Sequence, residues 1–300
     1  MNPTTQYRLG LLLVTGSAIA WSTAGYFTRL IPQDNWTLLF WRGVFAGLGI
    51  FLFMLVKDGR GAWRQFGQLR GPGWLFAIVS GGGMVVYITA LTLTTVAHVA
   101  IIYCVAPFIA AGLAFVVMGE RPTWIAVGAS LVALAGVVVM VGFTAGEGSI
   151  FGDLLALMMT IAMAVMMVIS RRHRDIPILA AACLSAVLSA AAAWPFASHA
   201  LPSTIEMVEL ALFGLVNSAV GIALFTLGAR LIPAVETALI GALDAPLAPV
   251  WVWLAFGETP GRNTILGGIL VMGAVLVNIS LGTRKSRALP NAAQTGFDAG

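Results

Sequence analysis

One aspartate, Asp244, stands inside a long apolar run near the C-terminal end of the chain, and Pro246 and Pro249 follow it. At about 1.5 Å per helical residue, it would lie about 14 Å into that run, near the midplane of a bilayer. A carboxylate there costs at least about 2.5 kcal/mol, so we expect it to line a water-filled path or to join two helices by a hydrogen bond. The prolines cannot donate backbone hydrogen bonds, which would free the carbonyls of Ala242 and Ala245 for water or ligand. These residues favour binding of a polar solute over bond-breaking chemistry.

Other polar or aromatic residues fall inside apolar runs. Asn217 lies near the middle of one, where an amide can bridge helices or line a cavity. Trp21 and Ser22 lie just past the middle of the first, and Trp21 is too deep for an interfacial belt, which favours a cavity wall. Tyr87 and Tyr103 fall in the outer halves of their runs, where each can anchor at the interface or point into a cavity. We treat all five as candidate substrate contacts.

Met163 and Arg42 could also meet a solute. Met163 belongs to a methionine-rich run, which indicates packing first and an adaptable apolar pocket second. Arg42 lies about two helical turns into its run. We expect it to snorkel to the interface or form a buried structural bond, with recognition of a substrate carboxylate as the alternative.

Several classes of protein lack support in the sequence. There is no phosphate-binding G-x-x-x-x-G-K-[ST] loop, no H-E-x-x-H metal motif and no paired intramembrane aspartates. Both cysteines, Cys104 and Cys183, fall inside apolar runs and are expected to pack there rather than bind metal. We therefore expect no enzyme activity, no cofactor, no metal and no nucleic-acid partner.

The elements that position these residues are membrane spans. Of the 300 residues, 59% are hydrophobic and only 9% are charged, whereas soluble domains carry about 25% charged residues. Runs of about 20 apolar residues, enough to cross a bilayer, occur at 9–30, 37–56, 73–93, 97–118, 123–142, 150–170, 177–196, 207–229, 235–256 and 263–282. The sequence predicts an all-α integral membrane protein with ten spans.

The charges predict the orientation of those spans. With the N-terminus inside, all of the 16 Lys and Arg residues fall in inside segments except Arg29, Arg42 and Arg262. Positive residues favour the cytoplasmic side. Both termini are therefore expected in the cytoplasm, in a membrane of the bacterial inner (plasma) type.

Two matching stretches indicate an internal duplication. Pro107 lies near the middle of one span, with Gly119-Glu120 after its end, and Pro246 lies similarly before Gly257-Glu258. We predict helix breaks at Pro107, Pro246 and Pro249. Five spans per copy is an odd number, so the copies would be inverted relative to each other. The expected units are 1–145, 146–283 and a disordered cytoplasmic tail, 284–300.

Small residues mark expected helix contacts. Gly43 and Gly47 share one helix face and predict close packing. Gly81, Gly82 and Gly83 lie together inside a span, and they indicate either very close packing or a flexible point in a moving helix.

The ten spans, the repeat, Trp21-Ser22, Phe40-Trp41-Arg42 and the two Gly-Glu pairs resemble the EamA-type drug/metabolite transporter superfamily, and the resemblance covers residues 8–283. Within it, the chain is most similar to YddG-type exporters of aromatic amino acids. Those exporters tend to carry tryptophan where this chain has Ala106 and Met163, which points to a wider pocket. The resemblance implies a central cavity lined by Trp21, Tyr87, Tyr103, Met163, Asn217 and Asp244, with alternating access.

The expected function is secondary transport. We expect export of amino acids, including large neutral and aromatic ones, with a small molecule and the lipid bilayer as partners and a monomeric state. The alternatives are an exporter of another metabolite or drug and, in a different class, a channel or a membrane scaffold without transport.

Overall fold

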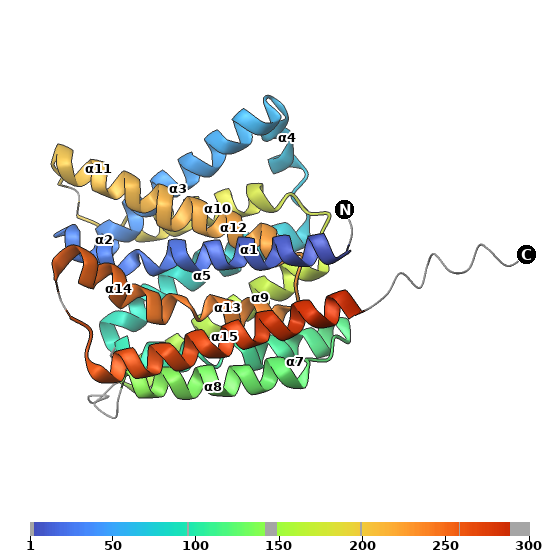
Figure 1. The fold of residues 1–300 in the computed structure, drawn as a ribbon. Helices are drawn as coiled ribbons and strands as arrows, with labels where there is room; N and C mark the ends of the chain where they lie inside the picture. The colour runs from blue at the N-terminus through green and yellow to red at the C-terminus, as the bar shows by residue number, and fades with distance from the viewer. Residues whose placement is uncertain (1–2, 95, 142–148, 199, 258, 289–300) are drawn as a thin grey trace, which may run out of the picture.

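The computed structural model describes residues 3–94, 96–141, 149–198, 200–257 and 259–288, and within these ranges every regular element is a helix. Nine helical segments of the described chain are long and apolar enough to cross a membrane, and one shorter apolar helix joins them (Figure 1). The predicted all-α membrane fold is therefore confirmed.

The first half runs from α1 to α8. Its elements are α1 (Pro3–Ser22), α2 (Ala24–Leu30), α3 (Asn35–Asp58), α4 (Gly61–Gly67), α5 (Gly71–Leu93), α6 (Val96–Tyr103), α7 (Ala106–Met118) and α8 (Trp124–Val141).

The second half runs from α9 to α15. Its elements are α9 (Ile150–Arg172), α10 (Ile178–Ala193), α11 (Thr204–Leu212), the π-helix η1 (Phe213–Val220), α12 (Gly221–Gly228), α13 (Ala234–Gly241), α14 (Asp244–Phe256) and α15 (Arg262–Ala288).

The helix α10 forms the shorter apolar segment, where a full span was expected at 177–196. It has 16 residues, Pro177 precedes it and Pro195 follows within two residues of its end. Proline fits poorly inside a helix, so the two prolines limit its length. Most of α10 is small and buried against α3 and α5.

The helix contacts repeat between the halves. The helix α5 packs on α9 and, correspondingly, α12 packs on α1. In the same way α3 packs on η1 and α10 on α5, while the last spans, α8 and α15, pack on each other. Exchanging the halves thus reproduces the contacts, as a pseudo-two-fold axis requires.

The two halves are inverted. Glu120 and Glu236 line one pocket, so the α7–α8 connection and the start of α13 share one end of the bundle. Tyr7, near the start of α1, bonds to Glu236, and Arg171, near the end of α9, bonds to Glu120. The first span of one half therefore begins where the first span of the other ends. We call this the N-terminal end.

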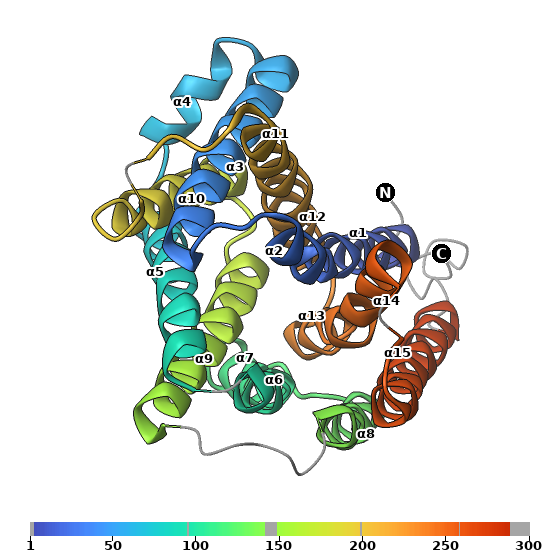
Figure 2. The ribbon, with the colours of Figure 1, turned by 90° about the vertical axis from the view of Figure 1, so that its left-hand side faces the viewer.

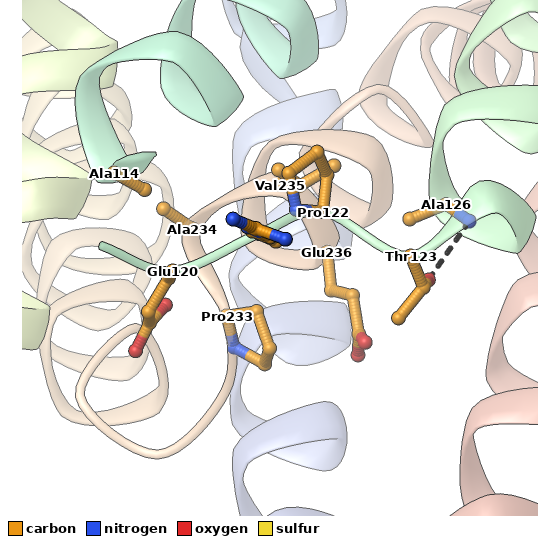
Figure 3. A pocket seen from close by; sticks show the side chains of 10 residues that line it. Ala114, Glu120, Pro122, Thr123, Ala126, Pro233, Ala234, Val235 and Glu236 are labelled. Atoms are coloured by element: carbon orange, nitrogen blue, oxygen red, sulfur yellow. Dashed lines mark hydrogen bonds between the residues drawn. The ribbon is translucent and has the colours of Figure 1, made fainter. Parts of the chain in front are cut away.

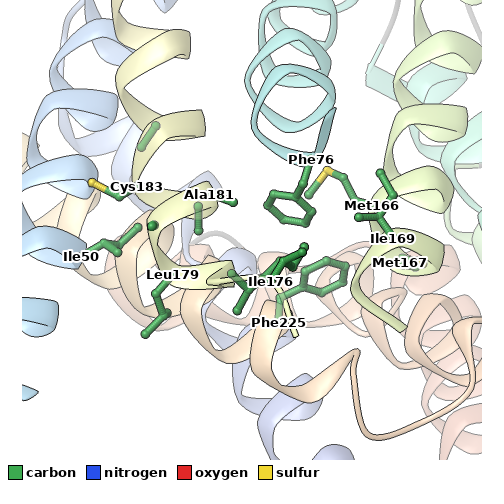
Figure 4. Close-up of a cluster of buried hydrophobic side chains, with 14 of the residues drawn as sticks. Ile50, Phe76, Met166, Met167, Ile169, Ile176, Leu179, Ala181, Cys183 and Phe225 are labelled. Atoms are coloured by element: carbon green, nitrogen blue, oxygen red, sulfur yellow. The ribbon is translucent and has the colours of Figure 1, made fainter. Parts of the chain in front are cut away.

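Apolar packing joins the halves near that end. Figure 4 shows part of the largest buried cluster, in which Phe76 of α5, Met167 of α9 and Phe225 of α12 approach one another. Figure 2 shows α13 inside the bundle, beside α1, α7 and α9, and all eight of its residues are buried.

The three adjacent glycines serve close packing rather than a break. A Cβ on Gly81 would lie 2.9 Å from the backbone oxygen of Ser185 in α10, and one on Gly83 would lie 3.2 Å from Ala162 in α9. Gly82 faces open space, and α5 runs through all three without interruption. Gly43 likewise meets α10, at the backbone oxygen of Ala186.

The C-terminal helix is longer than expected. The predicted tail began at residue 284, but α15 continues to Ala288. Residues 284–288 contain no proline or glycine, so no residue type among them ends the helix. The rest of the predicted tail, 289–300, lies outside the described residues, as do Glu258 and the predicted boundary near residue 145.

Candidate functional site

Two spans are interrupted near their middles, just before a proline. The helix α6 ends at Tyr103 and α7 begins at Ala106, with Pro107 at its second position. The helix α13 ends at Gly241 and α14 begins at Asp244, with Pro246 at its third position. The first turn of a helix leaves its amides without helical partners, so proline costs little there.

The break predicted at Pro249 is not formed, because α14 continues through it. Pro249 lies in the second turn, where its ring removes one bond, to Ala245, from a helix that has already begun. The expectation of a free carbonyl at Ala242 is also wrong, since that oxygen accepts a bond from the Ala245 amide at 3.3 Å.

Asp244 is the first residue of α14, so its carboxylate lies at the positive end of that half-helix. Its side chain is neither fully buried nor fully exposed. In inverted-repeat transporters a half-helix N-terminus at membrane depth attracts anionic groups, and here Asp244 itself supplies a carboxyl group at that position.

The Tyr103 hydroxyl lies 3.7 Å from where a Cβ on Gly241 would stand, three residues before Asp244. Tyr87 packs in one apolar cluster with Tyr103. The two tyrosines and Asp244 are partly accessible. Met163 of α9 packs in the same apolar cluster as the two tyrosines. The structure thus brings four predicted site residues, from α5, α6, α9 and α14, to one place, the Asp244 cluster.

The other three predicted residues form a second cluster, where the first span is interrupted at Thr23 between α1 and α2. Asn217 donates from Nδ2 to the backbone oxygens of Ala20 and Trp21, both at 3.0 Å. The Trp21 ring packs on Phe225, with 5.0 Å between the ring centroids. Asn217 and Trp21 therefore support the interrupted helix.

Ser22 connects this cluster to α14. Its Oγ donates to the backbone oxygen of Ile19 at 2.7 Å and accepts from Trp251 Nε1 at 2.8 Å. Because Trp251 belongs to the half-helix that Asp244 begins, the interrupted helices of the two halves are directly bonded.

The sequence predicted neither the break at Thr23 nor the role of Trp251. No proline marks that break. One signal was available, since Ser22 and Thr23 are consecutive hydroxyl residues inside an apolar span, and such side chains compete for backbone carbonyls. Both bond back three residues, Thr23 to Ala20 at 2.6 Å.

The N-terminal end is held by polar contacts between the halves. Tyr7 donates to Glu236 at 2.6 Å, and Arg171 bonds to Glu120 at 3.2 Å. Arg172 also donates to the Val117 backbone oxygen. Figure 3 shows Glu120 and Glu236 in the lining of a pocket of about 230 Å³ at this end.

The opposite end also has contacts between the halves. Asp153, in the first turn of α9, bonds to Thr94 at 2.7 Å and to His98 at 3.0 Å. Gln33 donates to Glu206 at 3.0 Å. Each end of the bundle therefore has polar contacts that a relative movement of the halves would have to break.

No metal centre is evident in the part of the chain that the structure describes, since no three His, Cys, Asp or Glu side chains gather suitably there.

Ala106 and Met163 stand at the two positions where YddG-type exporters tend to carry tryptophan. Ala106 is buried, whereas Met163 is partly accessible.

Comparisons with known proteins agree with this architecture. A crystal structure with the bare title "Crystal structure of protein" matches with a TM-score of 0.78 and 22% identity, covering 91% of this chain and 98% of that one. At that identity the likeness supports the fold. Among curated proteins, none matches the chain.

The family model of the EamA-like transporters matches twice, over residues 8–142 and 150–280, once in each half. These two matches cover most of the chain. The chain therefore belongs to the EamA-like transporter family and is a multi-pass membrane transporter.

Proposed function

We propose that this transporter exports amino acids, including large neutral and aromatic ones, across the inner membrane by alternating access. The observation that carries the proposal is the Asp244 cluster. It offers a carboxyl group at a half-helix N-terminus beside two tyrosines and a methionine. A carboxylate suits a substrate ammonium, while tyrosine rings and a flexible thioether suit apolar side chains of different shapes.

Alternating access is supported by the repeat. The helix contacts of one half recur in the other half, and each half contains interrupted helices. In such transporters the halves rock around a fixed midplane site. The contacts Tyr7–Glu236 at one end and His98–Asp153 at the other would then open in alternation.

The proposed orientation places the N-terminal end in the cytoplasm. Arg171 and Arg172 lie there, beside the α7–α8 connection. Basic residues concentrate on the cytoplasmic side of membrane proteins.

Flux into liposomes tests the proposal. Purified protein should give saturable uptake of a radiolabelled neutral amino acid without ATP, because a carrier has a limited number of sites. Empty liposomes are the control. Flux that rises linearly with concentration would indicate a channel, and no flux over a broad amino-acid panel would contradict amino-acid transport.

An exporter of another metabolite or drug is the second candidate. Met163 favours it, since a flexible side chain beside the tyrosines accepts varied apolar groups. A thermal-shift screen over amino acids and other metabolites separates the two, because only ligands that bind the folded state raise its apparent stability.

A further inference from the structure

Arg42 of α3 carries a positive charge inside the bundle. Its side chain is only 9% exposed, although the surface of this membrane protein is otherwise rich in exposed apolar side chains. A guanidinium that snorkelled to the lipid headgroups would be exposed on the bundle's outside. The expected snorkelling arrangement is therefore not formed.

The charge of Arg42 has no counterion in the described chain. The ion pairs there are His98–Asp153 and Arg171–Glu120, and no hydrogen bond from Arg42 to a described residue is formed. The expected alternative, a buried structural bond, is thus not formed among these residues either. A buried charge without a partner is costly, so such a group normally meets a counter-charge in the working protein.

The guanidinium still reaches open space. Among the described residues, Arg230 Nε and Ser218 Oγ are examples of polar atoms that are fully enclosed and have no hydrogen-bond partner. The Arg42 nitrogens do not belong to this group. Because the Arg42 nitrogens also have no hydrogen-bond partner, they must keep some accessible surface. The hydrogen-bond donors of Arg42 are therefore unpartnered and not completely enclosed.

The neighbours of Arg42 connect it to the Asp244 cluster. Its Cζ lies 5.5 Å from the centroid of the Phe213 ring in η1, which holds the guanidinium from one side. Tyr87 packs in one apolar cluster with Leu39 of α3, about one turn before Arg42, and in another with Tyr103 and Met163. The same tyrosine therefore borders both this turn of α3 and the Asp244 cluster, and no ion pair joins Arg42 to Asp244.

We propose that Arg42 binds the carboxylate of the transported solute, while Asp244 faces its ammonium group. The inference rests on the proposed amino-acid transport and narrows it to zwitterionic substrates. Guanidinium groups match carboxylates with two parallel hydrogen bonds, which lysine cannot reproduce. An amine or an amide of the same side chain would lose this contact.

Competition against L-phenylalanine uptake in liposomes tests the subsite, with L-phenylalanine and L-phenylalaninamide as competitors. For the wild type, the amino acid should compete at least about tenfold better than the amide, the size expected for a hydrogen bond to a charged group. Arg42→Gln should weaken competition by the amino acid by roughly 10- to 100-fold and leave competition by the amide unchanged. For Arg42→Lys, competition by the amino acid should lie between the values for the wild type and Arg42→Gln.

Lys57→Gln is the matched control, since it removes one positive charge at an exposed position. It should keep the wild-type preference. Equal weakening of acid and amide by Arg42→Gln would overturn the subsite and indicate a structural role. If that variant does not fold, the wild type still decides, because equal competition by acid and amide overturns the inference. Absence of flux for every neutral amino acid would instead contradict the proposed function.

Discussion

The side-chain amide of Asn217 donates a hydrogen bond to the backbone oxygen of Trp21 across 3.0 Å. The donor lies in the π-helix η1 and the acceptor lies one residue before the end of α1. Short π-helical segments often occur at functional sites, and η1 is eight residues long. Here the irregular turn of one half satisfies carbonyls that the interrupted helix of the other half exposes.

Replacing Asn217 with leucine should destabilise the protein and impair transport together. The Trp21 carbonyl would lose this donor, whereas the Ala20 carbonyl would keep its bond from the Thr23 hydroxyl. Loss of a donor costs about 1–3 kcal/mol for a buried group and less where the unfolded state in the membrane finds other partners. The melting temperature in detergent should fall, and uptake should fall with it.

Ser218→Ala is the control for Asn217→Leu. The Ser218 hydroxyl is buried without a partner in the described structure, so its removal should be neutral or stabilising. If both substitutions lower the melting temperature equally, the interaction of Asn217 with α1 is not the cause.

Replacing the adjacent glycines of α5 with alanine should affect the stability of the protein differently at each position. Gly81→Ala places a methyl 2.9 Å from the Ser185 backbone oxygen, and overpacking of this kind costs about 1–3 kcal/mol. Gly82→Ala meets open space and should be neutral or stabilising, because alanine favours a helix. Thermal unfolding of both variants measures the difference, and equal effects would contradict the assigned packing.

Tyr7→Phe should make the N-terminal end open more readily. It leaves Glu236, which is only 7% exposed, without its donor. Loss of a partner to a buried group costs about 1–3 kcal/mol, which favours any state where Glu236 meets water. A cysteine introduced at the pocket residue Thr123 should react faster with a soluble maleimide, against a low background because Cys104 and Cys183 are buried.

Tyr26→Phe is the matched control for that experiment, since Tyr26 lies in α2, toward the other end of the same span. It should leave the labelling rate at Thr123→Cys unchanged. Unaltered labelling in Tyr7→Phe would show that its contact with Glu236 does not hold this end closed.

Asp244→Asn should abolish any response of transport to a pH gradient; exchange of substrate should persist but with a raised KM, because the amide carries no charge to meet the substrate ammonium. Asparagine keeps the shape and position at the start of α14 but cannot take up a proton. Uptake with and without an imposed gradient measures this, with the outlying Asp58→Asn as the control. A wild type that ignores the gradient would contradict proton coupling and leave Asp244 a binding role.

Asp34 should stabilise the start of α3 at neutral pH and not in strong acid. Partial burial opposes its charge, but bonds from Thr37 Oγ1 and from the Trp36 and Thr37 amides outweigh this and hold the pKa of Asp34 below its usual value. A group with a lowered pKa stabilises above its unfolded-state pKa, about 3.9, and loses this as the pH falls through the folded value.

Asp34→Ala should therefore lower the free energy of unfolding by about 1 kcal/mol at pH 7. Melting temperatures measured at pH 7 and near pH 3 should show the difference between wild type and variant shrinking in acid. A difference that is constant over this range would contradict the capping role.

Local sequence rules predicted the part of the fold that depends on local physics. Apolar runs of membrane length predicted the spans, because hydrocarbon excludes polar backbone that is not internally bonded. The positions of Pro107 and Pro246 coincide with interrupted helices. Proline lacks a backbone amide hydrogen, and this removes a hydrogen bond from its own helix whatever that helix packs against. Pro249 shows the limit of that rule, since proline inside the first two turns of an established helix does not end it.

What depends on a neighbouring helix was decided only by the tertiary structure. Asn217 could bridge or line a cavity, and the carbonyls exposed at the end of α1 gave it partners. Gly81 could mark packing or a flexible point, and the approach of α10 requires packing. The type of Arg42 was plain from the sequence, but its burial without a counterion was not, because electrostatic pairing depends on distances between segments that are far apart in the chain.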